Sequence, residues 1–138
     1  MLIPQRRSLP QGQLLINHQW CDAADGATMP IIDPTTEAVI TDVAKATIAD
    51  VNAAVEAAHR AFETGVWPRM HHEERAKILI RIADLIDERG EEIGLRESMD
   101  MGMPYRDFMD IILPHCSGLF RFFAGQAMTG MNGSYRSS

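Results

Sequence analysis

The chain has 138 residues, of which 46% are hydrophobic and 23% are charged, and its formal net charge is −6. This composition is typical of one globular domain, and the negative balance argues against a nucleic-acid partner, which needs a dense basic surface. The longest early apolar run, Leu14-Leu15-Ile16, is too short for a signal peptide or a membrane span. We therefore expect a cytoplasmic protein without a membrane partner.

The first third of the chain has the pattern of β-hairpins. Residues 1–13 show no periodicity and are expected to form a flexible lead. Short β-type runs span Leu14–Cys21, and the Asn17-His18 pair that interrupts them is expected to turn with positive φ. Strand-like residues follow at Met29–Ile32 and, after a tight proline-containing turn, at Ala38–Ala46.

Four mainly amphipathic helices are expected after these strands. Thr47, with Asp50 three residues later, resembles a capping box at the start of the first helix, and Gly65 is expected to end it. The second helix, near His72–Arg89, has the strongest apolar periodicity, and Gly90 is expected to end it. The apolar stripe of the first helix consists of Val51, Val55, Ala58 and Phe62.

The last two helices are marked by their ends. The third, around Glu91–Met101, is expected to stop at Gly102. Pro114 is best placed in the first turn of a last helix that runs to about Met128. The polar residues 129–138 are expected to form a disordered tail.

The sequence lacks the pattern of a nucleotide-binding sheet. Nothing after Ala46 reads as a strand, whereas a Rossmann unit alternates strands with helices. The glycines nearest to a phosphate-binding loop are Gly125, Gly130 and Gly133, and their spacing fits neither common motif. We therefore expect no cofactor site in this chain.

Cysteine and histidine residues offer little chemistry by themselves. Cys21 and Cys116 lie far apart with no CxxC pattern and no nearby cationic cluster, so an inert role is favoured over a nucleophile. Adjacent His71 and His72 at a helix start cannot face the same side, which makes them a poor metal pair.

Five short motifs in a fixed order resemble the amino-terminal part of the NAD(P)-dependent aldehyde dehydrogenase family, over about residues 14–128. The resemblance implies an α/β fold of which this chain holds hairpin strands and four helices, without the parallel cofactor-binding sheet. Two departures are His71, where the family often has Ser or Thr, and Met103, where it usually has Lys. The motifs are Ile32-Asp33-Pro34-Thr35-Thr36-Glu37, Trp67-Pro68 with Glu74-Arg75, Ile82-Ala83-Asp84-Leu85-Ile86, Asp100-x-Gly102-x-Pro104 and Phe120-Arg121-Phe122-Phe123-Ala124-Gly125.

The resemblance also implies a function that this chain would share only as part of a longer one. Members of the family oxidise an aldehyde to a carboxylic acid with NAD or NADP, using a cysteine nucleophile and a glutamate base. Those groups and the cofactor site match no position of this sequence, so we expect no catalysis by the chain alone. The expected partners are the remainder of the enzyme chain and further copies in a homo-oligomer. The alternative is a non-enzymatic helical module for partner binding or assembly.

The same resemblance implies two further sites. In several members, carbonyl groups before the Asn/Asp-Pro turn and an aspartate hold Na⁺ or K⁺, and the matching positions are Ile31, Ile32 and Asp100. Asp100 could equally be a turn carboxylate that bonds backbone amides. Ile111 and His115 match positions at the mouth of the aldehyde tunnel, but Ile111 in the core and His115 exposed on a helix is an equal alternative.

Overall fold

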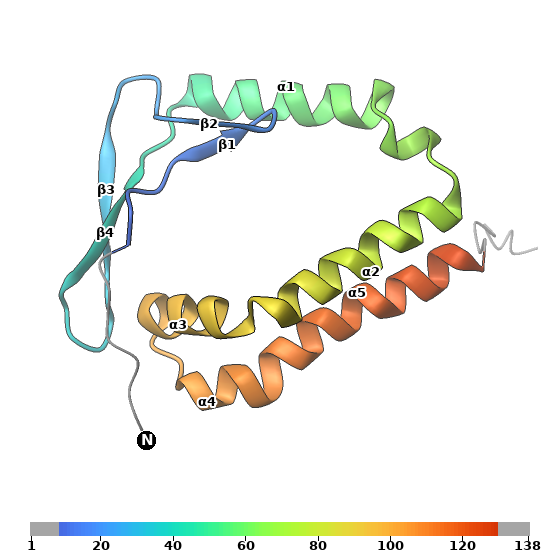
Figure 1. Cartoon of the computed structure of the whole chain (residues 1–138). Coiled ribbons are helices and arrows are strands. Elements are labelled where there is room, and N and C mark those ends of the chain that lie inside the picture. Colours follow the sequence, from blue (N-terminus) through green and yellow to red (C-terminus); the bar gives the residue numbers. More distant parts are fainter. Residues whose placement is uncertain (1–8, 130–138) are drawn as a thin grey trace, which may run out of the picture. The chain divides into compact units, whose positions relative to one another are not determined.

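A computed structural model of the chain describes residues 9–129; most of the expected tail, residues 130–138, lies outside the described residues. Two compact units are present, one formed by the residues up to 68 with 95–103, the other by 69–94 with the residues from 104 on. In chain order the elements are β1 (Leu14–Ile16), β2 (Gln19–Cys21), β3 (Thr28–Ile32), β4 (Val39–Ala44), α1 (Ile48–Thr64), the 3-10 turn η1 (Trp67–Arg69), α2 (His72–Glu88), α3 (Gly90–Met101), α4 (Tyr105–Asp107), the π-helical segment η2 (Phe108–Ile112) and α5 (Leu113–Met128) (Figure 1).

The first hairpin confirms the turn expected at Asn17-His18. Strands β1 and β2 are antiparallel, with Leu15 opposite Trp20. Asn17 has φ 50° and His18 has φ 64°, so both lie in the left-handed region. A two-residue turn with two positive φ values matches the twist of the strands it joins, which explains the tight connection.

The second hairpin is held by a buried aspartate. Strands β3 and β4 are antiparallel, with a register shift between Ile31 and Ile32. Asp33 is buried at the end of β3, and its Oδ1 accepts hydrogen bonds from the backbone amides of Thr35 (2.8 Å) and Thr36 (3.2 Å). Both bonds come from amides of the following turn and set its direction.

Part of the expected flexible lead is hydrogen-bonded to the sheet. The Gly12 amide donates to the Asp42 carbonyl (2.9 Å), and the Ala44 amide donates to the Gly12 carbonyl (2.8 Å). The Thr41 hydroxyl donates to the Pro10 carbonyl at 3.0 Å. Residues 10–12 thus run parallel to β4, a pairing that no local periodicity in the sequence could reveal.

Helix α1 begins with the capping box expected from the sequence. The Thr47 hydroxyl accepts from the Asp50 amide (3.3 Å), and the Asp50 carboxylate accepts from the Thr47 amide (2.8 Å). Asp50 also accepts the Ala24 amide, at 3.2 Å to each oxygen, which ties the preceding loop to the helix. The helix ends at Gly65 as predicted, while its apolar stripe, including Val55 and Phe62, is exposed.

In the second unit α2 and α5 lie side by side (Figure 1). The residues buried between them are small, namely Ala76 and Ala83 of α2 and Ser117 and Ala124 of α5. Small side chains allow two helices to approach closely. The bounds of α2, His72–Glu88, and of α5, Leu113–Met128, confirm the expected helices, and none of the helices in residues 9–129 is long and apolar enough to cross a membrane.

Gly90 has a different role from the one expected. It is the first residue of α3, and α2 already ends at Glu88 with Arg89 as its cap. A Cβ atom on Gly90 would collide with Cδ2 of Leu113. The glycine is therefore explained by the close approach of Leu113 rather than by a left-handed helix end.

Pro114 lies in the first turn of α5, as expected, and further helical structure precedes it. Residues Tyr105–Met128 form one continuous helical run through α4, η2 and α5. Proline has no amide hydrogen to give to the carbonyl four residues back, at Asp110, so an ordinary α-helix would be interrupted there. The run is nevertheless continuous at this point, and the residue before the proline, Leu113, donates its amide to the Phe108 carbonyl, five residues back.

Candidate functional site

The two residues expected at the tunnel mouth lie on this continuous run. Ile111 is in η2 and His115 in the first turn of α5. Both side chains are exposed, and Ile111 shows 64% of its surface to solvent. Four residues of a helix, whether α or π, close about one turn, so the two side chains share a side of the run.

The residues expected to hold a cation belong to the first unit. Asp100 is exposed in the last turn of α3, and Ile31 and Ile32 close β3. Gly102 has φ 74°, and a Cβ atom there would lie 3.1 Å from Cγ of Pro34. The turn that follows Asp100 therefore packs against the turn that follows Ile32.

Strand register decides which carbonyls are available near Asp100. Asp42 turns its carbonyl toward Gly12, so the neighbouring residue Thr41 turns toward β3. Ile31 is the partner of Thr41 in the register, and the register shifts directly after it, between Ile31 and Ile32. Within residues 9–129 no three His, Cys, Asp or Glu side chains form a group that could hold a metal ion.

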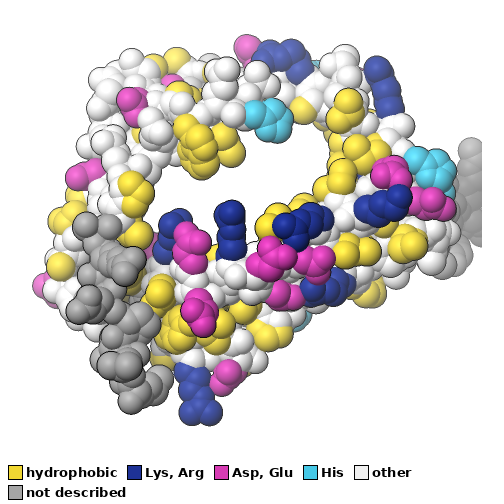
Figure 2. Space-filling view, viewed as in Figure 1, with side chains coloured by type: hydrophobic (Ala, Val, Ile, Leu, Met, Phe, Trp, Pro, Cys, Tyr) yellow, Lys and Arg dark blue, Asp and Glu magenta, His cyan; other side chains and the backbone are white. Residues whose placement is uncertain are grey.

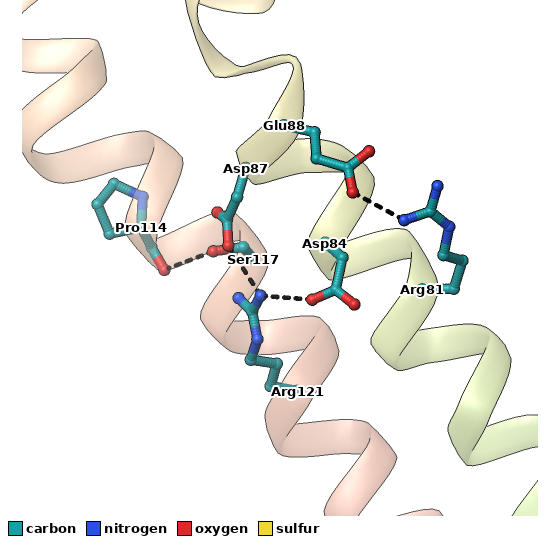
Figure 3. Close-up of polar contacts among 7 residues, drawn as sticks. All are labelled: Arg81, Asp84, Asp87, Glu88, Pro114, Ser117 and Arg121. Atoms are coloured by element: carbon teal, nitrogen blue, oxygen red, sulfur yellow. Dashed lines mark hydrogen bonds and ion pairs between the residues drawn. The ribbon is translucent and has the colours of Figure 1, made fainter.

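A charged cluster links α2 to α5 and was not expected from the sequence. Arg121 of α5 donates from Nη2 to Asp84 Oδ1 (2.9 Å) and to Asp87 Oδ2 (2.8 Å) of α2 (Figure 3). The Ser117 hydroxyl has one proton to share between the Asp87 carboxylate and the Pro114 carbonyl, 3.4 Å away. Charged side chains of both signs gather over this helix pair (Figure 2).

These contacts change the proton affinities of the cluster. Hydrogen bonding by Ser117, then by Arg121, lowers the pKa of Asp87 below its usual value. The same carboxylates raise the pKa of Arg121. A proton-transfer pair needs two groups whose pKa values are shifted apart in a site shielded from water. This cluster is half exposed, so it acts as a charged link between two helices.

The remaining reactive side chains have structural surroundings. Cys21 and Cys116 are both free thiols, and Cys21 Sγ lies 3.7 Å from the Leu14 carbonyl oxygen across the first hairpin. The His71 and His72 rings lie 4.1 Å apart at the start of α2. His71 occupies the N-cap position without a side-chain hydrogen bond, so it does not replace the cap that Ser or Thr would provide.

The fold and the motifs agree with the comparisons to known proteins. The sequence model of the aldehyde dehydrogenase family matches residues 20–138, and the chain belongs to this family. It is 42% identical over 120 residues to a mitochondrial benzaldehyde dehydrogenase of Antirrhinum majus, covering 87% of this chain and 22% of that one. It is 44% identical over 115 residues to the mitochondrial aldehyde dehydrogenase family 2 member B4 of Arabidopsis thaliana, covering 83% and 21%.

Solved structures give the same assignment. An NAD-dependent aldehyde dehydrogenase from Sinorhizobium meliloti superposes with TM-score 0.85 at 35% identity, over 92% of this chain and 25% of that one. The NAD⁺ complex of an aldehyde dehydrogenase from Bacillus cereus superposes with TM-score 0.85 at 33% identity, over 94% and 26%. The chain thus spans about a quarter of the length of these relatives and corresponds to an amino-terminal part of an aldehyde dehydrogenase-like oxidoreductase.

Proposed function

We propose that this segment serves in an enzyme that oxidises an aldehyde to a carboxylic acid with NAD⁺ or NADP⁺. The observation that carries the proposal is the 42% identity to a benzaldehyde dehydrogenase over 87% of the chain. The agreement of the hairpins and helices with an NAD⁺ complex of the same family supports it.

In this proposal the segment lines the path of the aldehyde and contributes no reacting group. Neither Cys21 nor Cys116 matches the position of the family's nucleophile, and each lies in an ordinary element, β2 or α5. The nucleophile, the base and the cofactor site then come from the remainder of the enzyme chain, which is the main partner of this segment. The nicotinamide cofactor would accept the hydride there.

The starts of three helices support the expectation that the described residues bind no dinucleotide by themselves. A helix N-terminus binds phosphate when its free amides face the anion without competing negative charge. The first turns of α1, α2 and α3 all carry carboxylates, which repel an anion. These carboxylates are Asp50, Glu73, Glu74, Glu91 and Glu92.

Two measurements test the proposal. The 138-residue chain should show no saturable binding of NAD⁺ or NADP⁺ in titration calorimetry. A complete chain that contains these residues should reduce NAD⁺ or NADP⁺ in the presence of an aldehyde. An in-frame continuation beyond Ser138 without a glycine-rich strand–helix unit and a later cysteine would count against the enzyme.

We also propose that Ile111 and His115 face the aldehyde on its way to the reaction centre. Their exposure on one side of a continuous helical run supports this position, because it leaves both side chains accessible to a substrate. A histidine there would place a polar, titratable group beside the substrate and favour smaller or more polar aldehydes.

The third proposal is a monovalent-cation site at Ile31, Ile32 and Asp100. The packing of Gly102 against Pro34 brings the two motifs together within the first unit, which supports it. Oxygen ligands with a single carboxylate suit Na⁺ or K⁺. Further ligands would come from the remainder of the chain, so the segment alone should bind such an ion weakly.

The exposed stripe of α1 favours a second candidate, a non-enzymatic module for partner binding or assembly. Val51, Val55 and Phe62 form an apolar face that nothing in residues 9–129 buries. Expression of the chain without any continuation, together with a stable folded state, would favour this candidate over the enzyme.

Assembly and compartment complete the proposal. We propose that the complete enzyme is a homo-oligomer in the cytoplasm, although two of its relatives are named as mitochondrial. Light scattering of the complete enzyme and imaging of a tagged chain test these two statements separately.

A further inference from the structure

The π-helical segment brings two large apolar side chains to one side of the helix. Phe108 and Leu113 are five residues apart and only 5% and 8% exposed. In an α-helix, at about 100° per residue, five residues would set the two side chains about 140° apart. Here the bond from the Leu113 amide to the Phe108 carbonyl closes a turn of five residues, so both side chains face the same way.

Two glycines of α3 receive these side chains. Gly90 and Gly94 are four residues apart and therefore share a face of α3. A Cβ atom on Gly90 would collide with Leu113, and one on Gly94 would lie 2.9 Å from Cδ1 of Phe108. The same atom would lie 3.0 Å from Tyr105 Cε2 and 3.1 Å from Met109 Sδ.

The pairing is a match between two kinds of turn. One α-turn separates the two glycines of α3, and one π-turn separates Leu113 from Phe108. The two glycines lie about 6 Å apart along the axis of α3, and both contacts form at once. Ile111 lies between the two buried residues in sequence and is exposed, which places it on the side away from α3.

We propose that the π-turn and the contact of Phe108 with Gly94 act together as a positioning device, which turns the side of the helix that carries Ile111 and His115 away from α3 and toward the aldehyde. This inference rests on the proposed function. If η2 became an ordinary α-helix, the residues before it would rotate by about 100° relative to α5. Ile111 and His115 would still share a side, but Phe108 and Leu113 could no longer both pack on α3. Either Phe108 would leave Gly94 or the side that carries Ile111 and His115 would turn relative to α3, and the path offered to the aldehyde would change.

The experiment compares Gly94→Ala with Gly118→Ala in a complete enzyme that contains these residues. Gly118 is also helical, but a Cβ atom there would meet nothing within 4 Å, so it is a matched control. We expect Gly94→Ala to change the ratio of kcat/KM for long and short aliphatic aldehydes by about tenfold, because one methylene of fit has an effect of that size. Gly118→Ala should leave the ratio unchanged. General destabilisation would lower both kcat/KM values together and leave their ratio constant.

Hydrogen exchange supplies a readout that is independent of activity. Backbone amides of residues 105–113 should exchange faster in Gly94→Ala than in the parent, and as in the parent in Gly118→Ala. A double variant, Gly94→Ala with Phe108→Leu, relieves the contact and should restore the aldehyde ratio toward the parent value. If Gly94→Ala gives no folded enzyme, Phe108→Leu alone loosens the same contact from the other side and should shift the ratio.

An unchanged ratio in Gly94→Ala, with or without faster exchange, would overturn the proposal, as would an equal shift in Gly118→Ala. A parent enzyme that oxidises no aldehyde would instead contradict the proposed function. In that case the exchange rates of residues 105–113 still show whether Gly94 holds the π-turn.

Discussion

Shortening the side chain of Leu113 tests how much the contact between α5 and α3 contributes to the free energy of unfolding. Leu113 is 8% exposed and packs on Gly90. Leu113→Ala deletes three carbon atoms, each worth about 0.8 kcal/mol of burial, and leaves a cavity that adds to this loss. We expect the free energy of unfolding to fall by about 3 kcal/mol, an upper estimate because denatured chains are partly compact. Urea unfolding followed by circular dichroism at low protein concentration measures it.

The same substitution elsewhere in α5 provides the control. Leu119 is 44% exposed, so Leu119→Ala should cost roughly 1 kcal/mol or less, and it leaves no closed cavity. Helix propensity changes equally in both variants and cancels in the comparison. Equal losses in the two variants, or a loss below about 1 kcal/mol for Leu113→Ala, would refute the packing of Leu113 on Gly90.

Four further outcomes are expected. Hydrogen bonds from the Thr47 backbone and side chain and from the Ala24 amide hold the pKa of Asp50 below its usual value. The contribution of Asp50 to stability is therefore present above the unfolded pKa of about 3.9 and is lost as the pH falls through the folded pKa. Asp50→Asn should lower the unfolding temperature at pH 7 and make that temperature less dependent on acid pH. Arg121→Gln should lower the unfolding temperature at low salt and lower it much less at 1 M salt, where the screening length is about 3 Å. Arg106→Gln breaks an ion pair between residues four apart on one helical run, and it should lower the unfolding temperature by a smaller amount. In the complete enzyme, His115→Met should raise kcat/KM for long aliphatic aldehydes relative to short ones, and an unchanged chain-length profile would return His115 to a surface role. Asp100→Ala should abolish any stabilisation by K⁺, and stability that still responds to K⁺ would contradict the cation site.

Local chemistry explains the parts of the fold that the sequence predicts. The start of α1 depends on Thr47 and Asp50, which satisfy each other's amides within one turn. The first hairpin depends on two residues that tolerate positive φ. In both places the interaction lies within a few residues of chain, so the pattern and the structure agree.

Long-range contacts explain the parts that it does not. Gly90 has the local appearance of a helix end, but its neighbour in space is Leu113, 23 positions later. Pro114 marks the first turn of α5 as expected, but the π-turn that precedes it has no motif of its own. Within the candidate site, the pairing of Arg121 with Asp84 joins residues 37 apart and leaves no trace in local periodicity.

Residues 10–12, which pair with β4, also protect this protein against aggregation. Free strand edges invite pairing with a foreign strand. Residues 10–12 occupy the outer edge of β4 at Asp42 and Ala44, and Pro30 lies opposite Asp42 on β3 with its nitrogen turned outward. A proline at that point offers no donor to an incoming strand. A chain shortened to begin at Leu14 would keep both hairpins yet leave the β4 edge open, and it should aggregate more readily for that reason alone.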